Sequence, residues 1–166
     1  IGALGEAAAV EVENVEEKID LALISPTDKS AMITHAKGCI EKNIPFCFDP
    51  GQAIPAFSPQ ELMMLIGQAK FLIGNDYEIK MMENKTGWSK AEMFGHVEIM
   101  ITTYGEKGSL ISSDDGDVEI KACQPNSVSD PTGAGDAYRA GFFSAYIDGH
   151  DVKTCGQVGS VAASYA

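Results

Sequence analysis

The sequence predicts an α/β protein with a mostly parallel sheet and helices on both of its faces. Short apolar runs alternate with longer segments of helical spacing, and this order is typical of parallel strands joined by helices. Two later runs alternate in polarity around the acidic turn 114–117, which predicts an antiparallel hairpin at one edge of the sheet. Hydrophobic residues make up 45% of the 166 residues and charged residues 22%, as in ordinary globular proteins with one core.

The elements follow one another with turn signals between them. Strands are expected at the apolar runs 20–25, 45–49, 71–74 and 97–103, and at the hairpin runs 108–113 and 117–122. Helices are expected over 28–43, 58–70, 75–87, 89–94 and 135–147, and from Val152 onward. Because no repeat, low-complexity segment or linker separates these elements, a single domain over residues 1–166 is expected.

Several helix ends carry local signals. Asp28 and Asp151 stand directly before helical segments and are expected to cap them, since a short acceptor side chain can bind the free N–H groups of a first turn. Ser58 and Glu61 have the spacing of a capping box. Gly87 is expected to close the third helix.

Composition excludes several classes of function. The formal net charge of −12 argues against a general binder of nucleic acid or anionic membranes, because both need clustered Lys and Arg. No apolar run approaches the ~20 residues of a membrane span, and no secretory signal precedes the first expected strand. The four cysteines form no CxxC pair and no zinc spacing, which predicts reduced thiols in a cytoplasmic protein.

The segment SDPTGAGDAYRAGFF, residues 129–143, carries the clearest chemistry. Its small residues stand directly before a helical run, where free N–H groups and the helix dipole favour an anion. The N–H groups of Ala134, Gly135 and Asp136 could surround a phosphoryl group, and Asp136 could take the proton from an attacking hydroxyl. The alternative is a glycine-rich turn with an acid near a helix start. A dinucleotide fingerprint fails at Tyr138, where a small residue is needed, and no phosphate loop GxxxxGK[ST] occurs.

This segment closely resembles the C-terminal signature of the ribokinase-like, or PfkB, family of sugar and nucleoside kinases. The run 75–78, Asn-Asp-Tyr-Glu, resembles the NxxE motif of that family, and 103–108 resembles its TxGxxG segment. The three motifs occur in the family's order. The resemblance implies a three-layer α/β/α ribokinase-like fold and an ATP-dependent transfer of the γ-phosphoryl group to a hydroxyl of a sugar or nucleoside.

The resemblance also implies a role for each matched residue. Asp136 would be the catalytic base, and Gly133, Ala134 and Gly135 would form the anion hole. The other implied positions surround the nucleotide and its cations: Asn75 at the phosphates, Glu78 at Mg²⁺ through water, Thr103, Gly105 and Gly108 beside the nucleotide, Ser160 near the adenine, and Asp130 and Thr132 at a K⁺ site. For Asn75 and Glu78 the alternative is a helix cap followed by an early acid. The loop 49–52 is expected near the acceptor, or as a plain turn.

Family members are usually close to twice as long as this chain. The chain does not begin with Met and ends inside an apolar helical run, so a partial kinase domain, cut at both ends, is expected. The N-terminal lid and acceptor part and the final helices would be missing, and the isolated piece is predicted to be inactive and marginally stable. A homodimer through the missing lid is a further expectation. A nucleotide-binding regulatory relative without catalysis and a plain α/β binding module are the alternatives, and within the kinases the signature leans toward a nucleoside substrate.

Overall fold

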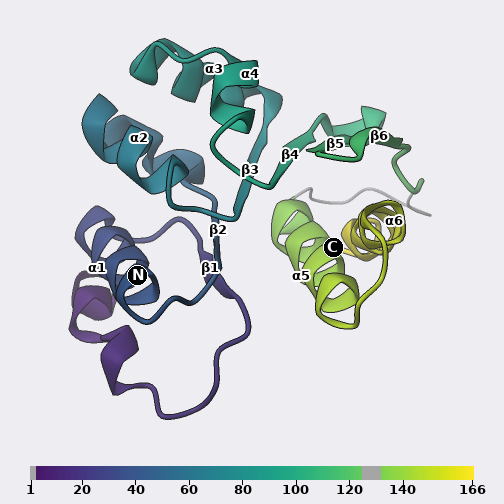
Figure 1. Cartoon of the computed structure of the whole chain (residues 1–166). Helices are drawn as coiled ribbons and strands as arrows, with labels where there is room; N and C mark the ends of the chain where they lie inside the picture. Colours follow the sequence, from purple (N-terminus) through teal and green to yellow (C-terminus); the bar gives the residue numbers. More distant parts are fainter. Residues whose placement is uncertain (1–2, 125–131) are drawn as a thin grey trace. The chain divides into compact units, whose positions relative to one another are not determined.

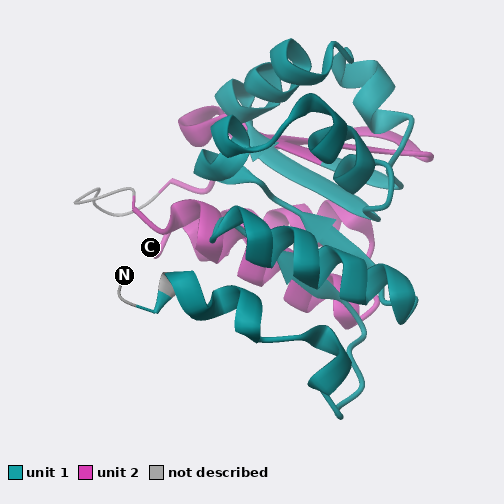
Figure 2. Cartoon of the chain, turned by 90° about the vertical axis from the view of Figure 1, so that its left-hand side faces the viewer, with its two compact units in different colours: residues 1–100 teal, residues 101–166 magenta. Residues whose placement is uncertain are grey.

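The computed structural model describes residues 3–124 and 132–166, and the chain divides into two compact units. The N-terminal unit covers residues 1–100 and the C-terminal unit residues 101–166, coloured teal and magenta in Figure 2. The boundary lies within strand β4 (Ile99–Thr103). The expected single domain over 1–166 stays a prediction.

Parallel strands form the centre of the N-terminal unit, as the alternation of runs predicts. The register joins β1 to β2 through Ala22 and Phe46, and β2 to β3 through Cys47 and Phe71. The strands of this sheet are β1 (Ala22–Ile24), β2 (Phe46–Phe48) and β3 (Phe71–Asn75). The helices between and after them are α1 (Lys29–Glu41), α2 (Pro59–Ile66), α3 (Asp76–Thr86) and α4 (Lys90–Phe94), all labelled in Figure 1. Each expected strand and helix of this unit is confirmed, with ends shifted by a few residues.

The core of the N-terminal unit forms around β2. Every residue of this strand is buried, as is usual for a strand with a parallel neighbour on each side and both faces covered. Phe48 meets Phe57 edge to face, with 6.0 Å between the ring centroids. Fully buried aliphatic side chains from the helices complete this core: Met32, Leu62, Leu65, Ile66 and Met82.

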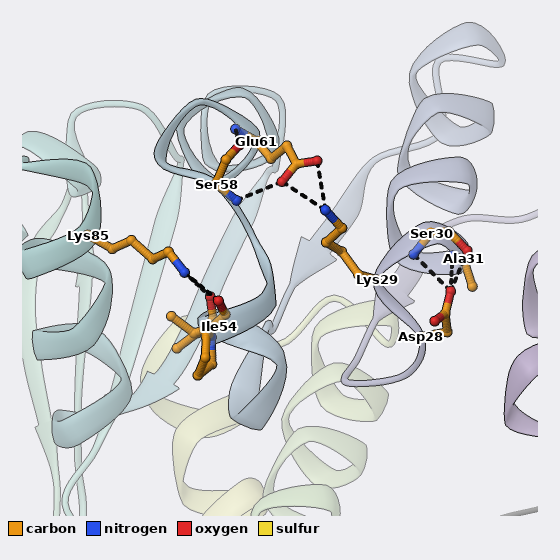
Figure 3. Close-up of polar contacts among 9 residues, drawn as sticks. Asp28, Lys29, Ser30, Ala31, Ile54, Ser58, Glu61 and Lys85 are labelled. Atoms are coloured by element: carbon orange, nitrogen blue, oxygen red, sulfur yellow. Dashed lines mark hydrogen bonds and ion pairs between the residues drawn. The ribbon is translucent and has the colours of Figure 1, made fainter.

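The predicted helix ends are confirmed by their hydrogen bonds. The carboxylate of Asp28 accepts from the backbone N–H of Ser30 at 2.9 Å, and that of Ala31 lies within 3.3 Å (Figure 3). Ser58 and Glu61 form the expected capping box, with the Ser58 N–H donating to the Glu61 carboxylate over 2.7 Å. Gly87 closes α3 in the left-handed region, at φ 77°.

Two lysines attach irregular segments to helices of the N-terminal unit by binding carbonyl oxygens. Lys85 of α3 donates to Ile54 O and Pro55 O over 3.0 and 2.7 Å, at the end of the 3₁₀ helix η3 (Gly51–Ala56; Figure 3). Lys42 follows α1 and donates to Val12 O, Glu13 O and Val15 O over 2.8, 3.0 and 3.3 Å. Two of these carbonyls belong to a second 3₁₀ helix, η2 (Val12–Asn14), which follows η1 (Leu4–Ala9), and the third belongs to the residue after η2. Neither N-terminal 3₁₀ segment was predicted, because such short turns have no apolar periodicity.

The C-terminal unit contains the predicted hairpin and two helices. Strands β5 (Ser109–Ser113) and β6 (Gly116–Ile120) are antiparallel, with Ser113 opposite Gly116 across a two-residue turn. They are followed by α5 (Ala134–Ile147) and α6 (Val152–Ala163), with Asp151 capping α6 as expected. A Cβ at Gly141 would lie 2.8 Å from Val158 O, so glycine permits the close approach of α5 and α6.

The four cysteines form no disulfide in the described part of the chain. Cys39, Cys47 and Cys155 are buried and Cys123 is exposed, and burial raises the pKa of the Cys39 and Cys155 thiols. Among the residues that the structure describes, no helix has both the length and the apolar composition needed to cross a membrane.

The capping box of α2 predicts a dependence of stability on pH. The Ser58 N–H and, after it, the Lys29 ammonium lower the pKa of the Glu61 carboxyl in the folded chain (Figure 3). A lowered folded pKa stabilises above the unfolded value of about 4.3, and this contribution is lost as the pH falls through the folded pKa. Glu61→Gln should therefore cost stability at neutral pH and cost less under acid conditions. Urea unfolding of both proteins at about pH 7 and about pH 3 measures this, and an equal difference at both would contradict it.

Candidate active site

The first turn of α5 presents backbone donors that no described residue caps. Gly133 precedes the helix in the left-handed region, at φ 92°, and no side chain of the described residues caps this end. The N–H of Ala137 donates to Gly133 O over 2.9 Å and so makes the first helical hydrogen bond. The N–H groups of Ala134, Gly135 and Asp136 precede that bond and have no helical acceptor. The turn therefore has the donors that the predicted anion hole needs.

The described residues leave space around the two glycines of this turn. A Cβ at Gly133 or at Gly135 would meet no described heavy atom within 4 Å. The positive φ of Gly133 explains that glycine by backbone conformation alone. Gly135 has neither a positive φ nor a crowded neighbour among the described residues, so its lack of a side chain suits the close approach of a ligand.

The Asp136 carboxylate is accessible, as a catalytic base must be. Its side chain is 77% exposed and forms an ion pair with Arg139, one helical turn further along α5. The Arg139 side chain is only 15% exposed, and its guanidinium contacts one oxygen of the Asp136 carboxylate. Sequence reasoning gave no role to Arg139 in the chemistry. An exposed carboxylate beside uncapped amides can accept a proton from a hydroxyl while the amides bind a phosphoryl oxygen.

The loop after β4 contains two glycines with different structural roles. At Gly108 φ is 97° and ψ is −139°, and a Cβ would lie 1.9 Å from Ile120 O, so the hairpin itself requires glycine there. Gly105 has φ 58°, but the space for a Cβ is open. The half-buried Thr103 ends β4, and the Tyr104 N–H donates to Gly108 O over 2.8 Å. The pattern TxGxxG is thus partly explained by backbone geometry, and contact of the loop with a nucleotide stays a prediction.

Asn75 and Glu78 form a capping box at the start of α3. The Asn75 side-chain oxygen accepts from the Glu78 N–H, and one Glu78 oxygen accepts from the Asn75 N–H, both over 2.8 Å. The pair thus forms the helix cap that was given as the alternative to a functional role. The Asn75 amide nitrogen and the second Glu78 oxygen have no partner among the described residues, so both stay available to a phosphate or a hydrated cation. The convergence of this motif with the motifs of the C-terminal unit stays a prediction.

The remaining predicted positions differ in what they can still bind. Ser160 is 8% exposed, and its hydroxyl accepts from the Cys123 N–H over 2.8 Å and donates to Lys121 O over 3.0 Å. It attaches α6 to the segment after β6, and its contact with adenine stays a prediction. Thr132 is exposed at the start of the turn, and Asp130 lies outside the described residues. Asp49, in the loop expected near the acceptor, is 3% exposed.

Sequence reasoning missed one contact beside this site. The hydroxyls of Ser109 and Tyr138 are 2.7 Å apart in the interior of the C-terminal unit. The two residues are 29 positions apart, and neither lies in a pattern that pairs them. The contact depends on the tertiary placement of β5 and α5 within the C-terminal unit, which no local sequence pattern specifies.

Comparison with known proteins gives matches to kinases of carbohydrates and nucleosides. The description "pfkB family carbohydrate kinase" matches residues 2–166. A nucleoside kinase of Methanocaldococcus jannaschii is 41% identical over 118 residues, which are 71% of this chain and 39% of that protein. A 5-dehydro-2-deoxygluconokinase of Bacillus subtilis is 33% identical over 58% of the chain and 31% of that protein.

Solved structures give the same result for the fold. The Burkholderia thailandensis nucleoside kinase in complex with inosine superposes with a TM-score of 0.95 at 34% identity, covering 98% of this chain and 54% of that one. The chain thus spans about half of that kinase, and 39% of the curated Methanocaldococcus relative. The expected ribokinase-like α/β fold is confirmed. By the match over residues 2–166, the chain belongs to the pfkB family of carbohydrate kinases.

Proposed function

We propose that the protein is an ATP-dependent kinase that transfers the γ-phosphoryl group to a hydroxyl of a nucleoside. The open, uncapped first turn of α5, with the exposed Asp136 carboxylate on it, is the observation that carries this proposal. The nucleoside as acceptor is supported by the names of two relatives, which are 41% and 42% identical and are nucleoside kinases. It is also supported by the similar structure from Burkholderia, which was solved with inosine.

The residues of α5 divide the reaction between them. Asp136 accepts the proton of the acceptor hydroxyl, whose oxygen forms the new bond to the γ-phosphorus. The bond from that phosphorus to the bridging oxygen breaks, and ADP leaves. Meanwhile the N–H groups of Ala134, Gly135 and Asp136 donate to the oxygens of the transferred group, where charge is concentrated in the transition state. Because Gly135 lacks a side chain, those oxygens can approach the amides closely.

We also propose Mg²⁺ and K⁺ as cations of this site. Bound Mg²⁺ would neutralise part of the phosphate charge. No group of three or more His, Cys, Asp or Glu suited to a metal occurs in the described part of the chain, and a hydrated Mg²⁺ needs only one or two carboxylates. The second oxygen of Glu78 fits this role through water, and the NH₂ group of Asn75 would instead donate to a phosphate oxygen. Asp130 and Thr132 remain the proposed K⁺ ligands, and a cytoplasmic location and a homodimer remain predictions.

Two alternatives remain open to test. A sugar or sugar-acid acceptor is supported by the similarity to the 5-dehydro-2-deoxygluconokinase of Bacillus subtilis. A nucleotide-binding regulatory relative without catalysis would not need a base, and the exposed Asp136 carboxylate argues against it.

A substrate panel tests the proposal. The full natural protein and the chain 1–166 are each incubated with ATP, Mg²⁺ and K⁺ and with inosine, adenosine, ribose or 5-dehydro-2-deoxygluconate, and ADP formation is followed. We expect the full protein to phosphorylate a nucleoside and the chain 1–166 to be inactive. If only ribose or the sugar acid is phosphorylated, the acceptor is a sugar or sugar acid and not a nucleoside. ATP binding without turnover of any acceptor would favour the regulatory relative.

A further inference from the structure

We propose that Tyr138 is a positioning residue for phosphoryl transfer, and that it acts through its hydrogen bond to Ser109. The proposal rests on the proposed function, since it assigns Tyr138 to the same site. Tyr138 is the residue that rules out a dinucleotide fingerprint, and no motif assigns it a role.

The hydrogen bond lies in the interior of the C-terminal unit. The Tyr138 hydroxyl and the Ser109 hydroxyl are 2.7 Å apart, and the two residues are 6% and 4% exposed. Burial raises the pKa of Tyr138, so the phenol stays protonated and either hydroxyl can donate. A buried hydroxyl that loses its partner pays a desolvation penalty, so the pair favours one arrangement of the two residues.

Each end of this bond is adjacent to a predicted site segment. Ser109 directly follows Gly108, the last residue of the loop expected beside the nucleotide. Tyr138 stands two residues after Asp136, on the buried side of α5, while Asp136 is on the exposed side. The bond therefore connects the loop 103–108 to the turn that carries the proposed base and the free amides.

The tyrosine ring is fixed by its neighbours. It stacks on Phe142 with 6.3 Å between the centroids and 17° between the planes. On α6, a Cβ added at Gly159 would lie 3.3 Å from two ring carbons, so the glycine leaves room for the ring and little more. Because the ring is held on these sides, the direction of the Tyr138 hydroxyl is fixed. The hydrogen bond to Ser109 therefore couples the position of the first turn of α5 to the position of β5.

A phenylalanine at position 138 would keep the ring and remove only the bond. If the hydroxyl served stability alone, Tyr138→Phe would lower the melting temperature and leave the kinetic constants unchanged. If it positions the site, catalysis falls as well, since small misplacements of reacting groups are costly.

The test is a double-mutant cycle in the full natural protein. Tyr138→Phe, Ser109→Ala and the double variant are assayed well below their melting temperatures, with kcat, KM for ATP and KM for the nucleoside measured separately. We expect each single variant to lower kcat/KM for ATP by about 3- to 30-fold, with little change in KM for the nucleoside. The double variant should be no worse than the poorer single variant, because both changes remove the same bond. Tyr165→Phe is the matched control, since Tyr165 is 86% exposed in the same unit, and it should match the wild type.

Two outcomes would overturn the proposal: wild-type kinetics in Tyr138→Phe, or losses that add fully in the double variant. Affinity for ADP, measured by calorimetry in the same four proteins, separates this proposal from the proposed function. If the wild type phosphorylates no acceptor, the proposed function fails, while a non-additive loss of ADP affinity would still support the link. If the wild type is inactive and the variants bind ADP as the wild type does, both the proposed function and the positioning role of Tyr138 are wrong.

Discussion

Asp136→Asn is expected to lower kcat by about 10²- to 10⁴-fold while the affinity for ATP changes little. The amide keeps the shape of the carboxylate but cannot accept the proton of the acceptor hydroxyl. The free N–H groups of the α5 turn belong to the backbone, so they remain in place to bind phosphate. Steady-state kinetics of the full natural protein and calorimetric titration with a non-hydrolysable ATP analogue separate the two effects.

Asp148→Asn is the control for this change. Asp148 is exposed at the other end of α5, so the substitution removes the same charge from the same helix without touching the first turn. It should leave kcat and ATP affinity unchanged. If Asp136→Asn reduced ATP affinity as much as turnover, Asp136 would be a binding or structural residue, and the proposed base would be wrong.

Gly108→Ala is expected to destabilise the chain on the order of 3–4 kcal/mol. At φ 97° and ψ −139°, this residue is in a region of backbone conformation that is essentially restricted to glycine. The new methyl group would also lie 1.9 Å from Ile120 O, a backbone atom of the partner strand that can move only if the hairpin opens. Urea unfolding followed by circular dichroism measures the loss.

Gly87→Ala is the control that separates the free-energy cost of a positive φ from the cost of a steric clash. Gly87 also has a positive φ, 77°, but a methyl group there would meet nothing within 4 Å. Its loss should be about 1 kcal/mol, the usual cost of a left-handed alanine. Equal losses at Gly87 and Gly108 would contradict the close approach of Ile120 O.

Much of the fold could be predicted because its signals are local. Asp28, Ser58 and Gly87 mark helix ends through hydrogen bonds and backbone angles that involve only the next few residues. The hairpin was predicted for the same reason, since two alternating runs flank the acidic turn 114–117, although the structure begins the second strand earlier, at Gly116. The roles of the site residues came from the resemblance to the family motifs, because no local rule of secondary structure assigns a role in catalysis.

What could not be predicted depends on contacts between distant segments. Asn75 and Glu78 match a functional motif and also satisfy a capping box, and the sequence cannot separate these roles because one spacing serves both. The glycine at position 108 is required by the carbonyl of Ile120, which lies on β6 twelve residues later. The contact of Tyr138 with Ser109 needs β5 and α5 in place, so its partner could not be named from the chain alone.

The two lysine anchors, Lys42 and Lys85, hold their segments through main-chain oxygens only. Every residue type has a carbonyl, so mutations in the anchored segments 12–15 and 54–55 can change side chains without removing the acceptors. A single change at either lysine removes all of its bonds at once. The attachment of each segment therefore depends on one distant lysine and not on the segment's own side chains, while burial in the core still constrains Ile54.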